Sequence, residues 1–141
     1  MPPRRKPSRF VLVLVTAKNC GHCRELVSTT WPQLSKQLSD AFPQLTIIHI
    51  NKDGINQRMQ ELNDQYGRPY PDVLNNWALW FPTLFLVREE DWNTGITSRT
   101  PVFIYNGQLV NGMAQSIVKS GVPVNNALIT NWIQTSLPNF G

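Results

Sequence analysis

The sequence predicts an α/β fold with a central, mixed four-stranded sheet flanked by helices. Short apolar runs rich in β-branched residues alternate with segments whose apolar residues recur at helical spacing. Apolar residues make up 41% of the chain and charged residues 16%, a composition typical of a sequence that folds around a core. A length of 141 residues suits one domain, so we expect a single domain over residues 10–141 behind a basic, flexible tail at residues 1–9.

The first half of the chain alternates strand and helix. Residues 10–15 are continuously apolar and predict a strand that is buried on both faces. Residues 46–50 predict a second strand. The helix after each strand shows one apolar stripe, and Pro32 is expected to kink the first helix or to begin a new segment. The stripes are Val27, Trp31, Leu34 and Leu38 in the first helix, and Ile55, Met59, Leu62 and Tyr66, ending at Gly67, in the second.

The next part of the chain predicts two more strands. Residues 68–77 form a loop by composition, and residues 81–87 predict the third strand. A polar connection over residues 88–100 leads to the fourth strand at residues 102–105. The two strand–helix–strand steps favour parallel neighbours for the first three strands, whereas the last two strands are expected to pair antiparallel.

The C-terminal part is predicted only in places. Asn106-Gly107 is a strong turn signal, but residues 108–122 carry no pattern that decides between strand and helix. A last helix is expected to begin near Asn125 or Asn126, either of which can cap it. Its core-facing residues are predicted to be Leu128, Ile129, Trp132 and Ile133.

The net charge of +4 is concentrated at the N-terminus. Thirteen Lys and Arg residues face nine Asp and Glu, and Arg4, Arg5, Lys6 and Arg9 account for the excess. The tail could make weak contact with nucleic acid, but no basic patch interleaved with aromatics marks the body as a nucleic-acid site. No apolar run approaches the roughly 20 residues that a membrane span needs.

The only two cysteines lie in the stretch Cys20-Gly21-His22-Cys23, between a predicted strand and a predicted helix. A bridge between them closes too small a loop to stabilise the fold much, which favours a chemical role. The alternatives are inert core thiols or half of a zinc site, but zinc normally takes four ligands and His49 is the only other Cys or His. We therefore expect thiol–disulfide exchange, with no metal and no cofactor beyond the redox-active Cys20–Cys23 disulfide.

Together with two later motifs, this stretch resembles the thioredoxin superfamily, because Cys-Gly-His-Cys is the active-site motif of protein disulfide isomerase domains. Asp64-Gln65-Tyr66-Gly67 is similar to the end of the family's next helix, and Phe81-Pro82-Thr83 is similar to its cis-proline loop. The resemblance covers about residues 10–137 and lacks the family's first strand and helix, which implies a shortened, glutaredoxin-like core. It implies a thiol–disulfide oxidoreductase that acts on protein thiols and disulfides.

The resemblance also implies roles for individual residues. Cys20, at the helix start, would attack first, and the more buried Cys23 would resolve the mixed disulfide. Gly21 would permit a tight turn, and protonated His22 would favour the Cys20 thiolate and make the disulfide a better oxidant. The substrate-binding residues would be Gly21, Asn19, Phe81 and Pro82, with the backbone of Phe81 free to pair with substrate.

Several positions depart from the family pattern. Asn19 stands where the family usually has Trp, and Leu14 stands where it often buries a carboxylate that accepts the proton of the second cysteine. Ser28 takes the place of the kinking proline, which here comes later, at Pro32. The segment before Phe81 is longer than usual and makes Pro71 a rival for the cis position, although the clear strand after Pro82 favours Pro82.

His49 and the tryptophans are expected to have mainly structural roles. His49 lies within an apolar strand, where a satisfied sheet histidine is favoured over a catalytic base. The five tryptophans are expected to be mostly core or interface anchors, with Trp77 and Trp80 as a minor candidate for a binding rim.

The sequence leaves a second functional class open. A thioredoxin-like binding or structural module, possibly a homodimer, would need little redox activity, and the departures at Asn19 and Leu14 favour it. The first residues lack the apolar core of a secretory signal, so an intracellular protein is expected. Because stable disulfides are rare in the cytosol, packaging in a particle or an oxidising compartment is the alternative.

Overall fold

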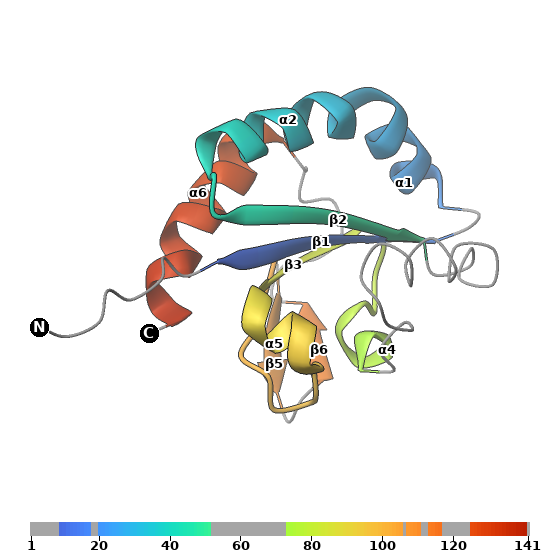
Figure 1. Ribbon diagram of the computed structural model, residues 1–141. Coiled ribbons are helices and arrows are strands. Elements are labelled where there is room, and N and C mark those ends of the chain that lie inside the picture. The colour runs from blue at the N-terminus through green and yellow to red at the C-terminus, as the bar shows by residue number, and fades with distance from the viewer. Residues whose placement is uncertain are drawn as a thin grey trace, which may run out of the picture.

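A computed structural model describes residues 9–17, 20–51, 73–105, 107–110, 113–116 and 125–140 (Figure 1). Its centre is a four-stranded sheet in the order β2-β1-β3-β4. Strand β1 pairs parallel with β2 and antiparallel with β3, and β3 pairs antiparallel with β4. The strands are β1 (Phe10–Thr16), β2 (Leu45–Asn51), β3 (Thr83–Arg88) and β4 (Phe103–Ile104). The predicted mixed four-stranded sheet is therefore confirmed.

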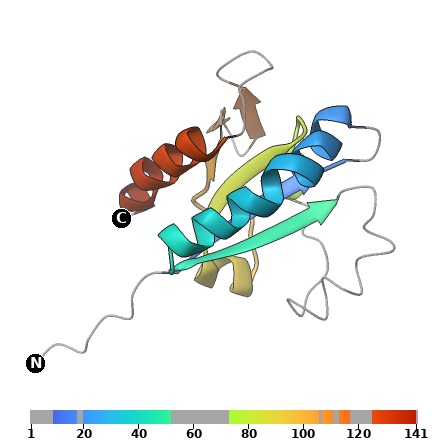
Figure 2. The same cartoon turned by 90° about the horizontal axis from the view of Figure 1, so that it is seen from above.

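Both faces of the sheet are covered (Figures 1 and 2). One face carries a continuous helical segment and the last helix, whereas the other carries two short helices and a β-hairpin. The first layer comprises α1 (Gly21–Glu25), a π-helical segment η1 (Leu26–Thr30), α2 (Trp31–Ala41), α6 (Asn126–Ser136) and the 3₁₀ turn η2 (Leu137–Phe140). The second comprises α4 (Leu74–Trp77), α5 (Glu89–Thr94), β5 (Gly107–Val110) and β6 (Met113–Ser116).

Strand β1 shows why two layers are needed. All seven of its residues are buried, as the unbroken apolar run predicts. Because successive side chains point to opposite faces, Leu12 and Leu14 pack in the cluster under α2 and α6. Val11, Val13 and Val15 pack in the cluster that includes Trp77 and Trp92 on the other face.

Pro32 changes the helix as predicted. It lies in the first turn of α2, where its missing N–H costs nothing. Just before it, the N–H of Trp31 donates to the carbonyl oxygen of Leu26, five residues back. This five-residue spacing is that of the π-helical segment η1, which lies between α1 and α2. Pro32 therefore stands at the start of a new helical segment, α2.

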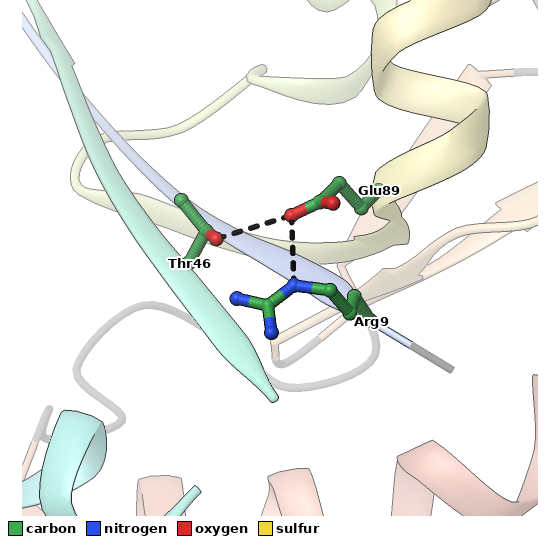
Figure 3. Close-up of polar contacts among 3 residues, drawn as sticks. All are labelled: Arg9, Thr46 and Glu89. Atoms are coloured by element: carbon green, nitrogen blue, oxygen red, sulfur yellow. Dashed lines mark hydrogen bonds and ion pairs between the residues drawn. The ribbon is translucent and has the colours of Figure 1, made fainter. Parts of the chain in front are cut away.

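Arg9, the last residue of the basic tail, contacts Glu89 of α5 (Figure 3). Arg9 Nε lies 3.4 Å from Glu89 Oε2, and the hydroxyl of Thr46 donates to the same oxygen at 3.3 Å. The backbone N–H of Glu89 also donates to the carbonyl oxygen of Arg9 at 3.0 Å. Because Arg9 is half exposed, the ion pair itself contributes little stability, and the backbone bond fixes where the chain enters β1.

The direction of β3 corrects a prediction. We expected β3 to run parallel to the first two strands, but it is antiparallel to β1, with Val15 opposite Thr83. Thr16 is likewise opposite Asn51, so β1 and β2 end where β3 begins. The connection between β2 and β3 therefore starts and finishes at the same end of the sheet, with β1 between the two strands that it joins. The antiparallel pairing expected between β3 and β4 is confirmed.

Three further predictions are corrected or completed. The polar connection at residues 88–100 contains α5, which has only one buried apolar side chain, Trp92, and so no apolar stripe. Strands β5 and β6 pair antiparallel as a hairpin, with Val110 opposite Met113. Helix α6 begins after the cap Asn125, as predicted, and buries Ile129 and Ile133. Leu128 is instead 41% exposed, because it lies about 100° around the helix from Ile129.

Some predictions concern residues outside the described ranges. They are the tail before Arg9, the helix expected over residues 55–66 with Gly67, the turn after Asn51, and residues 68–72 of the expected loop. Asn106 and residues 117–124 also lie outside. The rest of the loop prediction is wrong, because Leu74–Trp77 form the short helix α4.

The hairpin β5–β6 packs closely against Trp80 at Gly107. An added Cβ there would lie 2.7 Å from Trp80 Cη2 and 2.8 Å from the carbonyl oxygen of Gln115. Gly107→Ala is therefore expected to lower the free energy of unfolding by about 1–3 kcal/mol, because a close-packed contact must open. Denaturant titration measures this loss. Gly21→Ala is the matched control, since its Cβ meets nothing within 4 Å, and equal losses in both variants would contradict the packing explanation.

Candidate active site

Cys20 and Cys23 lie after the C-terminal end of strand β1, at the start of the helical layer. Cys20 is the N-cap residue of α1, with extended backbone angles (φ −103°, ψ 104°). Its sulfur accepts a hydrogen bond from the backbone N–H of Cys23 at 3.1 Å. Cys20 and Cys23 form a disulfide, and their Cα atoms are 5.2 Å apart. The N–H that now faces the sulfur is the group that would stabilise a Cys20 thiolate.

The two cysteines differ in exposure. Cys20 is half-buried, whereas Cys23 is only 2% exposed and faces the interior. An incoming disulfide or thiol can therefore reach Cys20 first. Cys23 is shielded from solvent, and a two-step exchange requires such a difference between the two sulfurs.

The loop before β3 lies against the dithiol. Cys20 Sγ is 3.7 Å from the carbonyl oxygen of Phe81, and the Phe81–Pro82 peptide bond is cis. Phe81 and Pro82 are both half-buried, so the loop presents backbone beside the reactive sulfur. The cis bond falls at Pro82, as expected, and its rival Pro71 lies outside the described residues.

The residues between the cysteines are exposed. His22 lies in the first turn of α1 and is exposed to solvent. Gly21 is also exposed, and a Cβ there would meet nothing within 4 Å. Its backbone therefore has no need for glycine, and the expected tight-turn role of Gly21 is not supported. Asn19, the remaining predicted substrate-binding residue, lies outside the described residues.

A polar pair that the sequence analysis missed lies beneath this end of the helical layer. The Thr16 hydroxyl and His49 Nε2 are 2.8 Å apart, across strands β1 and β2. Thr16 is 2% exposed and His49 is half-buried. The prediction of a hydrogen-bonded sheet histidine is confirmed. Thr16 gave no sequence signal, because a threonine at the end of an apolar strand is ordinary.

Leu14 completes the surroundings of the pair. It is fully buried and lies opposite His49 in the parallel register. Side chains at Leu14, Thr16 and His49 share the sheet face that the helical layer covers. No carboxylate is found among the described residues of β1 and β2, so the one titratable side chain on this part of the sheet is His49.

The tryptophans act mainly as core anchors. Trp77 is fully buried and packs edge-on against Phe85, with ring centroids 5.3 Å apart, so it cannot form a binding rim. Trp80 is half-buried and holds the hairpin at Gly107. Trp132 of α6 packs on Tyr105, and burial raises the pKa of the Tyr105 phenol.

Within the described ranges, no group of three or more His, Cys, Asp or Glu side chains could hold a metal ion. No helix in the same ranges is long and apolar enough to cross a membrane.

Comparison of the sequence with known protein families and with curated proteins finds no match to either. The chemistry must therefore be argued from the site itself.

Proposed function

We propose that the protein is a thiol–disulfide oxidoreductase with a thioredoxin-like fold, acting on protein thiols and disulfides through Cys20 and Cys23. The observation that carries the proposal is the environment of Cys20. Cys20 is half-buried, and its sulfur accepts a backbone N–H at a helix start and lies 3.7 Å from the backbone of the cis-Pro82 loop. The strand order and the mixed pairing of the sheet support the thioredoxin-like fold.

The reaction has two steps. In the reductive direction, the Cys20 thiolate attacks a substrate disulfide, forms a mixed disulfide and releases one substrate thiolate. Cys23 then loses its proton and attacks Cys20 Sγ, which forms the Cys20–Cys23 disulfide and releases the second substrate thiolate. Two electrons pass from the dithiol to the substrate, and the reverse sequence oxidises a substrate dithiol. The backbone of Phe81 is placed to align an extended substrate chain during both steps.

The proposal is tested by a redox titration. The protein is equilibrated in glutathione buffers of graded potential, and its free thiols are alkylated and counted by mass spectrometry. A single reversible two-electron transition, together with reduction of insulin by the wild type, is the expected result. A disulfide that stays intact across the range, with no insulin reduction, would favour the alternative of a binding module. The buried Leu14, in a place where a proton acceptor is expected, is the observation that keeps this alternative in view.

His22 is expected to set the potential. An imidazolium beside Cys20 favours the thiolate and hence the reduced dithiol, so it makes the disulfide more oxidising. His22→Pro removes this charge and should lower the reduction potential by about 30 mV or more, which is roughly tenfold in the exchange constant. The glutathione titration measures the shift. His22→Gln serves as a control that removes the charge without a proline, and an unchanged potential in both variants would contradict the role.

A further inference from the structure

The second step of the proposed reaction needs a proton acceptor. Cys23 must become a thiolate before it can attack Cys20, yet it is 2% exposed and has no direct route to bulk water. The nearest segments of β1 and β2 offer no carboxylate. A thiol whose ordinary pKa is about 8.5 reacts slowly near neutral pH unless a neighbouring group takes its proton.

The fold places Cys23 and Thr16 at the same end of the sheet. The helical segment begins at the C-terminal end of β1 and runs back over the sheet toward the start of β2 (Figures 1 and 2). Leu26 packs in the same cluster as Leu14. Cys23 lies one helical turn before Leu26, toward the start of the helical segment. Thr16 lies two residues after Leu14, on the same face of β1 and toward the C-terminal end of the strand. The buried Cys23 of α1 and the Thr16 hydroxyl of β1 therefore lie at the same end of the sheet.

His49 connects this buried hydroxyl to solvent. Its Nε2 is 2.8 Å from Thr16 Oγ1, and its side chain lines an open groove of about 480 Å³ between α2 and β2. Trp31 and Lys36 of α2 line the same groove. Lys36 is the only other ionisable side chain among the groove-lining residues, and β1 contributes only uncharged Leu14 and Thr16 on this face.

We propose that Thr16 and His49 form a proton relay that deprotonates Cys23 during resolution of the mixed disulfide; this inference rests on the proposed function. The Cys23 proton passes to Thr16 Oγ1 as the Thr16 hydroxyl proton passes to neutral His49 Nε2. The Cys23 thiolate then attacks Cys20 Sγ and expels the substrate thiolate. The imidazolium of His49 gives its proton to water in the groove, and water protonates the departing thiolate, so no proton is gained or lost overall. The hydrogen bond that satisfies His49 in the sheet is the one that carries the proton.

The test separates the two chemical steps. Reduced protein is mixed with oxidised glutathione at pH 5.5–8, quenched with acid at short times, and analysed by mass spectrometry for the mixed disulfide and the intramolecular disulfide. In the wild type, we expect the resolution rate to fall more steeply toward low pH, because a protonated His49 cannot accept the relayed proton. His49→Gln should slow resolution about tenfold or more and remove this additional pH dependence. Attack by Cys20 should change less than twofold.

Thr16→Val should slow resolution as His49→Gln does, whereas Thr16→Ser should restore it, because the serine keeps the hydroxyl. Lys36→Gln changes the charge of the groove without touching the Thr16–His49 bond, and its resolution rate should match the wild type. Unchanged resolution in folded His49→Gln would overturn the relay while leaving the proposed function intact. Because His49 is only half-buried, His49→Gln decides the question even if Thr16→Val fails to fold. Failure of the wild type to form either disulfide species would instead refute the proposed function.

Discussion

Replacing Cys20 with serine is expected to abolish disulfide exchange, whereas replacing Cys23 with serine should trap substrates on the protein. Only Cys20 combines exposure with a backbone N–H aimed at its sulfur, at 3.1 Å. A serine hydroxyl is not an effective nucleophile toward a disulfide, so Cys20→Ser should lose insulin reduction by at least about a thousandfold. Cys23→Ser keeps the attacking sulfur but loses the internal displacement, so its mixed disulfides should persist.

The assay follows insulin precipitation by turbidity and mixed disulfides by non-reducing electrophoresis. The double variant Cys20→Ser/Cys23→Ser is the control for non-specific association, and it should show neither activity nor a covalent adduct. If Cys20→Ser trapped partners as well as Cys23→Ser does, the assigned order of attack would be wrong. If the wild type reduced no insulin and all variants behaved alike, the protein would fit the binding module better.

Local patterns were enough to predict those parts of the fold that depend on neighbouring residues. The unbroken apolar run predicted β1, and Pro32 predicted the change of helix because the missing N–H acts within one turn. The Asn125 side chain caps α6 through a bond to the N–H of Leu128 at 2.9 Å, three residues away. Each of these features is decided over distances of a few residues in the chain.

Features decided over longer distances were missed. The direction of β3 depends on where the chain returns after a connection of about thirty residues, and no local pattern reports that. The Thr16–His49 bond joins residues 33 positions apart. The hairpin β5–β6 is a different case, since Asn111-Gly112 separates its strands and is itself a hairpin signal. The earlier Asn106-Gly107 drew the turn prediction, although Gly107 belongs to β5, against Trp80.

The same distinction applies to the candidate site. The motif from Cys20 to Cys23 and Pro82 could be predicted, because short sequence patterns define them. Their juxtaposition, 3.7 Å from Cys20 Sγ to the Phe81 carbonyl oxygen, is a product of the antiparallel pairing of β1 and β3. The sequence also showed that Leu14 stands where related proteins often bury a carboxylate, and the structure shows that Leu14 is fully buried.

Leu14→Glu is expected to speed resolution of the mixed disulfide and to destabilise the fold. Leu14 is fully buried in the apolar cluster under the helical layer, so a carboxyl group there loses its hydration. We expect a loss of about 2–4 kcal/mol in the free energy of unfolding. Burial also raises the pKa of a carboxyl group toward neutrality, which makes it an effective proton acceptor for a nearby thiol.

The position of His49 makes this variant informative about the relay. His49 lies opposite residue 14 in the parallel register, so the new carboxyl group would lie beside the Thr16–His49 pair. A carboxyl group that accepts the Cys23 proton itself should make His49 dispensable. In the background of Leu14→Glu, the additional change His49→Gln should therefore slow resolution less than twofold, compared with about tenfold in the native background.

Resolution rates come from the acid-quench assay with oxidised glutathione, and stability comes from denaturant titration. Leu14→Gln is the matched control: it has the same shape and a similar desolvation cost, but its amide cannot accept the proton. It should be destabilised without any gain in rate. A folded Leu14→Glu protein that resolves mixed disulfides no faster than the wild type would show that proton removal from Cys23 is not the slow step. The lack of a buried acid would then have no kinetic consequence, and the rate of His49→Gln in the native background would decide whether the relay already supplies the proton acceptor.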